Sequence, residues 1–419
     1  GGAMVAADPA FAKTDVDKLT IGGEIRERYE VRANAAMNQG NPLSNKGNES
    51  VASHRVRVNV GYDLTPDVSF FAQISDGRYF GTEAGAAANG AVAVSTSNAN
   101  FNGLDLHQGY IQLKNVLVPG LSLKAGRQEI IFGDHRLFGN FGWSQIGNAF
   151  DGVRLTHSAQ QANVDLFWAR IVDPFAVALG AAGQSNIGFP AASTATQSSN
   201  TQDIYGAYVT LKVAKTWTIE PYFFLLQDAR ASNVAAGGAP VSILTAQTPA
   251  QTRHFLGGRV NGKAGGLDFT YEGNYQFGSI DSTCQRSATA AACGTLPGQG
   301  GVSAAGFATG RNARINASQH AVKTGYTFDA VPMKPRLGFE FNYASGDSCA
   351  NGTNSMSCSG QQAHFNTADN LYPTNHFHMG YMDMMAWKNM VNYQVMFDVK
   401  PSPVSKLQFN YIMHRLANT

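Results

Sequence analysis

Apolar and polar residues alternate along much of the chain. In LDFTYEGNYQFGS (267–279) the odd positions are apolar, aromatic or glycine as far as Phe277, and the even positions up to Gln276 are polar. Because a strand sends successive side chains to opposite faces, this pattern predicts a strand with one apolar and one polar face. LTIGGEIRERYEVR (19–32) and RVRVNVGYDL (55–64) show the same alternation.

Similar stretches recur to the end of the chain. We expect about 15 strands, each long enough to cross a bilayer at roughly 9–11 residues when tilted. They are expected near 19–32, 55–64, 68–80, 104–113, 121–132, 151–158, 162–172, 205–212, 217–225, 252–264, 267–279, 315–328, 336–343, 389–399 and 406–413.

The connections between these strands alternate in length. Long connections are expected near 35–50, 81–103, 133–150, 173–201, 229–251, 279–314 and 348–386, and short ones such as TPD (65–67) and AGG (264–266) lie between them. Alternating short periplasmic turns and long extracellular loops are typical of outer-membrane barrels. The pattern therefore predicts an all-β, transmembrane, antiparallel up-and-down barrel, with apolar faces toward lipid and polar faces toward a water-filled lumen.

Composition narrows the class further. Only 14% of the 419 residues are charged and the net charge is +2, which gives no indication of nucleic-acid binding. No stretch approaches the roughly 18 apolar residues of a spanning helix. The start, GGAMVAADPA, shows no targeting signal. We expect residues 1–18 to form an N-terminal periplasmic segment and residues 19–419 to form the barrel.

Four cysteines occur as two pairs in stretches rich in Ser, Gly and Ala. Cys284 and Cys293 enclose eight residues, and so do Cys349 and Cys358. An even number of cysteines in loop-like sequence predicts a local disulfide within each pair. A zinc site is the alternative, but it would normally show the closer spacing C-x₂₋₄-C.

Three blocks resemble the bacterial alginate-export outer-membrane porin family. They are KAGRQEIIFGDHRLFGNFGWSQIGNAFDGVRL (124–155), YASGD (343–347) and FNTADNLYPTNHFHMGYMDMMAWKNM (365–390). The resemblance implies a monomer in the outer membrane of a Gram-negative bacterium, surrounded by lipid and lipopolysaccharide. It also implies 18 strands and an electropositive lumen through which an anionic uronate polysaccharide leaves the periplasm.

The strand count departs from the family. About 15 strands are visible before the chain stops at HRLANT, whereas barrels of this class have even numbers of strands. We therefore expect 16–18 strands, with 18 favoured. Either this chain lacks C-terminal strands or one strand is hidden in the sequence.

Arginines dominate the polar parity of the predicted strands. They stay charged and present a planar fork of donors suited to carboxylates, so they would favour passage of anions. The alternative is that they pair with lumenal acids and stiffen the wall. The inner-wall candidates are Arg26, Arg28, Arg32, Arg55, Arg57, Arg154, Arg259 and Arg336, and the resemblance adds Arg127 and Arg136 near a constriction or the base of an inward-folded loop.

Other functions have weaker support. A diffusion porin for small solutes is the main alternative to polyuronate export. A barrel hydrolase is the second alternative, but no catalytic motif is present, so we expect no enzyme. We also expect no cofactor and no metal site. The exception would be SGDSCANGTN (345–354), whose acidic and amide side chains suit Ca²⁺ in an extracellular loop.

Overall fold

The computed structural model describes a strand at each of the 15 expected positions, one of the long connections (133–150) and part of another (348–386). The described elements are almost all strands, and helical structure in the described residues is confined to one 3-10 turn and one short helix. The described residues are 16–33, 48–80, 102–172, 201–228, 251–281, 312–347, 364–381 and 385–418.

The strands match the expected ones closely. The expected strands coincide with observed ones to within a few residues at their ends, because alternation is a property of extended backbone. The largest difference is the strand expected near 121–132, which ends at Gln128, and residues 129–132 belong to a connection. The elements are η1 (Val16–Lys18), β1 (Leu19–Ala33), β2 (Asn48–Thr65), β3 (Val68–Tyr79), β4 (Asn102–Leu113), β5 (Leu121–Gln128), β6 (Phe150–Ser158), β7 (Ala162–Val172), β8 (Gln202–Ala214), β9 (Trp217–Asp228), β10 (Gln251–Ala264), β11 (Leu267–Asp281), β12 (Asn312–Thr327), β13 (Arg336–Ala344), β14 (His364–Phe365), α2 (His376–Met379), β15 (Met390–Ser402) and β16 (Ser405–Leu416).

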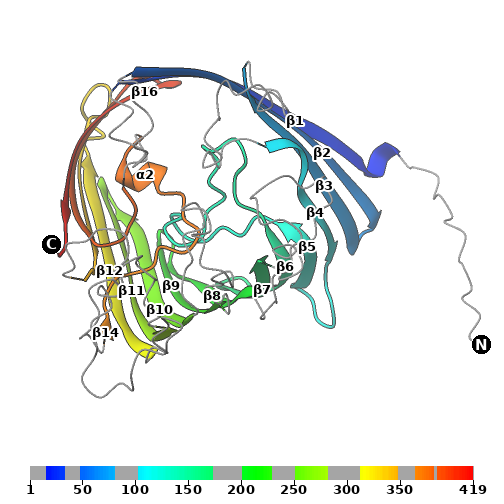
Figure 1. Cartoon of the computed structure of the whole chain (residues 1–419). Helices are drawn as coiled ribbons and strands as arrows, with labels where there is room; N and C mark the ends of the chain where they lie inside the picture. Colours follow the sequence, from blue (N-terminus) through cyan, green and yellow to red (C-terminus); the bar gives the residue numbers. More distant parts are fainter. Residues whose placement is uncertain are drawn as a thin grey trace, which may run out of the picture.

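The strands form one sheet that curves around a central space (Figure 1). Consecutive strands pair antiparallel from β1 to β13 and on through β15 to β16, and the two-residue β14 pairs parallel to β12. Among the described residues this sheet has 16 strands, and no pairing joins β1 to β16. The predicted all-β, up-and-down architecture is confirmed.

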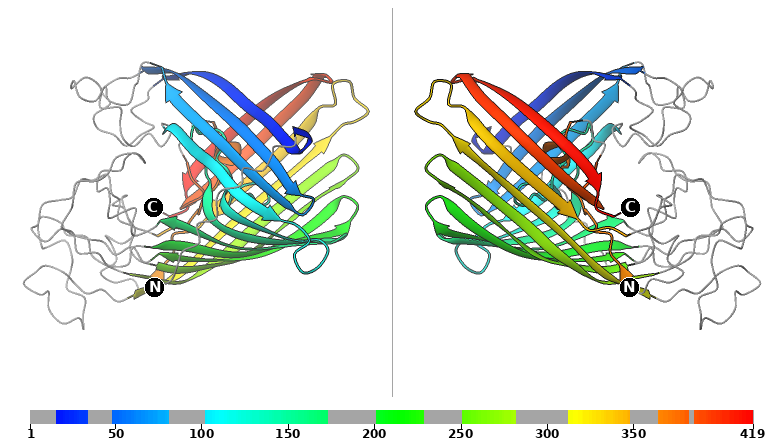
Figure 2. Two further views of the ribbon diagram at one scale, coloured as in Figure 1. Left: turned by 90° about the vertical axis from the view of Figure 1, so that its right-hand side faces the viewer. Right: turned by 90° about the vertical axis from the view of Figure 1, so that its left-hand side faces the viewer.

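Short and long connections alternate as predicted. Short turns join β2 to β3, β8 to β9, β10 to β11 and β15 to β16, whereas long connections precede β2, β4, β6 and β8. The turned views place the tight turns at one end of the sheet (Figure 2). In outer-membrane barrels this short-turn end faces the periplasm. No helix in the described ranges is long and apolar enough to span a membrane.

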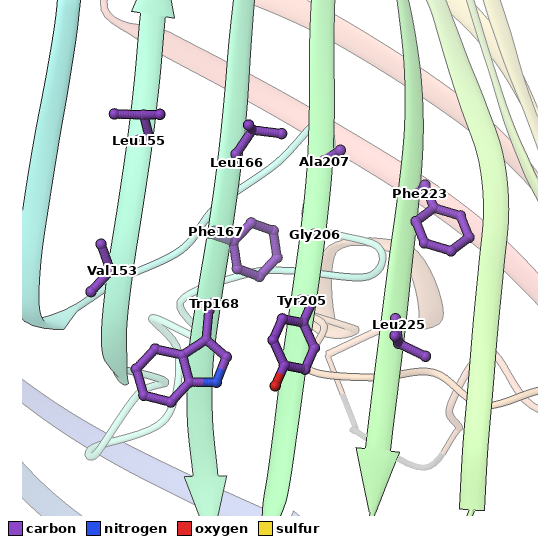
Figure 3. Close-up of a pocket in the computed structure, with 10 residues that line it drawn as sticks. All are labelled: Val153, Leu155, Leu166, Phe167, Trp168, Tyr205, Gly206, Ala207, Phe223 and Leu225. Carbon is purple, nitrogen blue, oxygen red and sulfur yellow. The ribbon is translucent and has the colours of Figure 1, made fainter. Parts of the chain in front are cut away.

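The outer face of the sheet is apolar. Val58 and Leu407 are 45% and 52% exposed, and Ile25 is 78% exposed. On the outer side of β6 to β9 a groove of about 360 Å³ is lined by Trp168, Tyr205 and neighbouring apolar residues (Figure 3). An exposed apolar surface of this extent would be exceptional on a soluble protein, but a lipid-facing wall requires it.

Arg127 lies on this outer face and does not line the lumen as predicted, although it does lie at the base of a connection that folds inward, as the resemblance implied. Pairing across β4, β5 and β6 continues without a bulge at Arg127, which is opposite Gly109 and Asp151. Its side chain is therefore on the same face as the exposed Val153. Arg127 Nη1 donates to Asp151 Oδ2 at 3.1 Å. The pair forms a cross-strand ion pair on the outside of the sheet.

Two connections fold into the central space. We call residues 129–149 the first inner segment and residues 364–389, described except for 382–384, the second inner segment. Phe138 and Tyr372 form a parallel β-bridge between them. Gly139 N donates to Tyr372 O at 2.9 Å, and Tyr372 N donates to Leu137 O at 3.0 Å. The two segments therefore form one inner layer.

An aromatic core attaches this layer to the wall. Phe138 is fully buried and its ring lies 4.9 Å from that of Phe224 on β9. Phe132 stacks on Tyr208 of β8 at 4.4 Å. The apolar core of the molecule thus lies inside the curved sheet on the β7–β9 side.

Several predictions fall outside the described residues. Cys284, Cys293, Cys349 and Cys358 all lie there, so both disulfides remain predictions. Most of the expected Ca²⁺ loop, from 348 onward, lies there too.

Candidate functional site: the lumen and its arginine contacts

Arg26 and Arg28 on β1 bind the backbone of the first inner segment. Arg26 donates to the carbonyls of Gly142 (2.7 Å), Trp143 (3.0 Å) and Ser144 (3.2 Å). Arg28 donates to Trp143 O at 2.6 Å, and its guanidinium lies 4.6 Å from the centre of the Trp143 ring. Both arginines face inward, as the strand parity predicted, but their donors point at peptide carbonyls.

Arg55 and Arg57 on β2 complete this contact. Arg55 donates to Gly142 O at 2.9 Å and Ser144 O at 2.6 Å, and it also pairs with Glu24 at 2.6 Å. Arg57 donates to the carbonyl of Ile146 at 3.1 Å. Four guanidinium groups therefore converge on residues 142–146, and we call this set the arginine clamp.

The sequence predicted these four arginines as a row of charges on the inner wall. In the structure they anchor the first inner segment to β1 and β2. Neither predicted role fully describes the arginine clamp, because the donors hold a loop instead of solute or wall acids alone. Arg32 lies opposite Glu49 in the β1–β2 register, but its side chain is not among the described ones.

Glu129 begins the first inner segment and contributes a negative charge beside the clamp. Its carboxylate lies 2.9 Å from His107 Nε2 and accepts from Asn140 Nδ2 at 3.2 Å. Burial raises the pKa of Glu129. These hydrogen bonds and the charges of His107 and Arg57 together lower it by more than burial raises it, so the net shift of the pKa is downward. The carboxylate is thus kept ionised.

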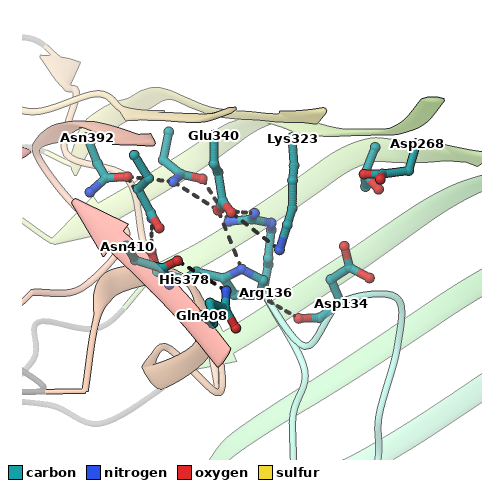
Figure 4. Close-up of polar contacts among 12 residues, drawn as sticks. Asp134, Arg136, Asp268, Lys323, Glu340, His378, Asn392, Gln408 and Asn410 are labelled. Atoms are coloured by element: carbon teal, nitrogen blue, oxygen red, sulfur yellow. Dashed lines mark hydrogen bonds and ion pairs between the residues drawn. The ribbon is translucent and has the colours of Figure 1, made fainter. Parts of the chain in front are cut away.

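Arg136 fixes the first inner segment on the other side of the lumen (Figure 4). It donates to Glu340 Oε1 at 2.7 Å and to Asn342 Oδ1 at 2.8 Å, both on β13. Lys323 Nζ lies 3.5 Å from the other Glu340 oxygen. Arg136 and Glu340 are almost completely buried, so Arg136 braces the inner layer and is not on an open pore wall.

His378 joins the two inner segments beside this pair. The Nε2 atom of His378 lies 2.7 Å from the carbonyl oxygen of Asp134, and the side chain of Gln394 donates to the backbone carbonyl of His378. Burial lowers the pKa of His378, and the Arg136 charge lowers it further, against the opposing effect of Glu340. His378 is therefore held neutral.

The remaining candidate arginines form ion pairs along the inner wall. Arg154 Nε lies 2.8 Å from Asp165. Arg259 bridges Asp134 of the first inner segment (2.5 Å) and Glu220 of β9 (2.9 Å). These contacts match the wall-stiffening alternative.

An open cavity of about 680 Å³ lies at the short-turn end, between the inner layer and β10–β16. We call it the vestibule. Six cationic side chains line it against three carboxylates, so its lining carries a net positive charge. The cations are Lys263, Lys323, Lys334, Lys400, Lys406 and Arg336, and the carboxylates belong to Asp134, Asp268 and Asp398.

Several of these cations are only partly neutralised. Arg336 is bound by Asp268 at 2.6 Å, and Lys406 lies 3.2 Å from Asp398. Within the described ranges, Lys263 and Lys400 have no carboxylate at ion-pairing distance, and both are exposed. An anion in the vestibule therefore meets accessible positive charge.

Strand parity had placed Lys263, Lys323 and Arg336 of the vestibule on the inner side, whereas Lys334, Lys400 and Lys406 were missed. Lys400 and Lys406 have the same parity as Asp398 and Gln408 on β15 and β16, so alternation already placed them inside. Lys334 lies in the turn between β12 and β13, where alternation gives no direction. In the part of the chain that is described, no cluster of three or more His, Cys, Asp or Glu side chains is suited to a metal ion.

A family model and solved structures both match this chain. The sequence model described as "Alginate export" matches residues 17–419. Comparison with curated proteins gave no significant match. Among solved structures, the outer membrane protein OprD from Pseudomonas aeruginosa is 9% identical with a TM-score of 0.50, covering 98% of this chain and 78% of that one.

Two further solved structures show weaker similarity. Pseudomonas aeruginosa OccK8 (OprE) is 14% identical with a TM-score of 0.48, covering 95% of this chain and 83% of that one. Pseudomonas putida OprB is 13% identical with a TM-score of 0.46, covering 95% and 90%. At 9% identity the likeness to OprD concerns the fold alone.

Proposed function

The chain belongs to the alginate export family of the Gram-negative outer membrane, and on that premise we propose that it conducts a polyuronate from the periplasm to the cell surface. The observation that carries this proposal is the vestibule. Its excess of lysines lies at the short-turn end, where a polyanion from the periplasm arrives first. A pore wall solvates ions poorly, so fixed positive charge must offset the cost of bringing a carboxylate inside.

Transport favours several weak contacts over one tight site, because the solute must also leave. Flexible lysines spaced around the vestibule fit this requirement, since each is a mobile point charge that exchanges one carboxylate for the next. The arginine clamp lies deeper, where carbonyls of residues 142–146 occupy its donors. We propose that a polyanion that passes the vestibule competes with these carbonyls for the clamp.

The complete barrel is part of the same proposal. We propose that it closes with 16–18 strands, functions as a monomer, and is surrounded by phospholipid and lipopolysaccharide. A closed barrel would satisfy the unpaired backbone groups of β1 and β16, which the hydrocarbon core cannot solvate.

Ion selectivity in planar bilayers tests the proposal. We expect a reversal potential that indicates anion selectivity, and block by uronate oligomers added at the short-turn end. Lys263→Gln combined with Lys400→Gln should reduce both, because these lysines are exposed and have no paired carboxylate in the described structure. Arg78→Gln is the matched control, since Arg78 is 49% exposed on the outer face of β3.

A diffusion porin for small solutes predicts a different result. Small neutral solutes would then pass readily, and uronate oligomers would block no better than neutral oligosaccharides of equal length. An unchanged reversal potential in the double lysine variant, with the barrel still folded, would contradict the polyuronate proposal.

A further inference from the structure

Phe377 is the one exposed apolar side chain among the described residues of the vestibule. Phe377 and Met396 are its only described apolar lining residues, and they are 60% and 2% exposed, respectively. All other described lining residues are charged, polar or glycine. The ring of Phe377 therefore offers an apolar face inside a cationic, water-accessible space.

The backbone on both sides of Phe377 is firmly held. His376 is buried and stacks on Trp143 at 4.3 Å. His378 is buried, contacts the carbonyl of Asp134 at 2.7 Å, and accepts from Gln394 at its own carbonyl. The anchored neighbours of Phe377 therefore hold its side chain in an exposed position.

The ring itself has little packing to gain. Its one aromatic neighbour among the described residues is His135, which meets it edge to face with centroids 6.1 Å apart. That contact orients the ring and leaves most of its surface open. An anchored, oriented and exposed aromatic ring is suited to binding a ligand that has an apolar face.

We propose that Phe377 forms a subsite for one sugar ring of the polyuronate. This inference rests on the proposed function and specifies its substrate. The C–H groups on the face of a pyranose ring carry slight positive charge, and they complement the negative face of an aromatic ring. The carboxylate of the same sugar, or of its neighbour, is available to the vestibule lysines.

Charge and stacking together distinguish polyuronates from other polyanions. A flexible polyanion without sugar rings, such as polyaspartate, contacts the lysines but has no ring to stack on Phe377. The subsite therefore adds selectivity for sugar acids to a vestibule whose lysines select only for negative charge. The stacking contact is weak and compatible with release.

Channel block by two matched polyanions tests this subsite. A uronate hexamer and a polyaspartate of equal charge are added to the short-turn side of the protein in planar bilayers. For Phe377→Ala we expect block by the uronate hexamer to weaken about three- to tenfold, and block by polyaspartate to change by less than about twofold. Phe377→Trp retains an aromatic face and should keep block by the uronate.

Controls separate this inference from the proposed function. Phe409→Ala removes an equally exposed aromatic ring, 62% exposed on the outer face of β16, and should change neither block. If the double lysine variant weakens both blocks while Phe377→Ala weakens neither, or weakens both equally, the sugar subsite is wrong and the cationic vestibule stands. If the lysine variant changes neither block, the proposed function itself fails.

Discussion

The guanidinium of Arg136 donates to the carboxylate of Glu340 at 2.7 Å, although the two residues are 204 positions apart in the chain. Their side chains are only 2% and 1% exposed. The pair connects the first inner segment to β13, while the arginine clamp connects the same segment to β1 and β2. The inner layer is therefore fixed to two parts of the wall by charged contacts.

Breaking the buried pair should loosen the first inner segment. Arg136→Met leaves the Glu340 carboxylate buried without its main partner, which we expect to destabilise the docked segment by about 3–5 kcal/mol. Single-channel recording should show larger and noisier conductance. Combining Arg136→Met with Glu340→Gln should restore much of the original behaviour, and unaltered conductance in the single variant would show that the pair does not hold the segment.

Tryptophan fluorescence can follow each inner segment separately. The chain has four tryptophans, of which Trp143 is in the first inner segment and Trp387 in the second. In a variant that keeps only Trp143, Arg26→Gln should shift the emission to longer wavelength, because three carbonyl contacts of the segment are lost and the ring gains water.

A variant that keeps only Trp387 is the control for that experiment. Trp387 is fully buried and donates to Tyr343 O at 3.0 Å, away from the clamp, so Arg26→Gln should leave its emission unchanged. Arg127→Gln, on the outer face, should change neither signal. Equal shifts for Trp143 and Trp387 would mean that the clamp supports the inner layer as a whole.

Docking of the second inner segment should weaken in acid. The pKa of His378 is lowered in the docked state by burial and by Arg136, whereas a histidine released into water has a pKa of about 6.5. The released state then binds more protons, so docking is favoured above that pH and is lost as pH falls through the lowered pKa. Limited proteolysis of the segment should accelerate below about pH 6.5, and His378→Gln should remove most of this dependence.

The assignment of faces can be tested with neighbouring residues of one strand. Val58 faces lipid, and a lipid-facing arginine costs about 2–4 kcal/mol near the bilayer centre. Asn59 shares the inner face with Gln73, which donates to it at 2.7 Å. Unfolding by urea in lipid vesicles should therefore show a large loss of stability for Val58→Arg and a much smaller one for Asn59→Arg.

The sequence by itself determined the strands and their two faces. Alternation with period two is a local property of extended backbone, so Val58 and Leu407 could be assigned to lipid, and Arg55 and Arg57 to the inside, without any knowledge of distant residues. Alternation left Arg127 open: its parity is that of Leu121 and Leu123, but a bulge near Gly126 could have switched the faces of the strand. Only the uninterrupted register of β5 placed its side chain on the outer face.

Only the tertiary structure decided what the inward side chains contact. Arg26 is separated from Gly142 by 116 positions, and no local pattern predicts that the arginine will donate its hydrogen bonds to neutral backbone carbonyls. The inner segments are irregular and have no periodicity that gives their side chains a direction, so Phe377 and Lys334 could not be placed from the sequence. Their positions depend on long-range packing of both inner segments against the wall, and this packing is cooperative, whereas alternation is fixed residue by residue.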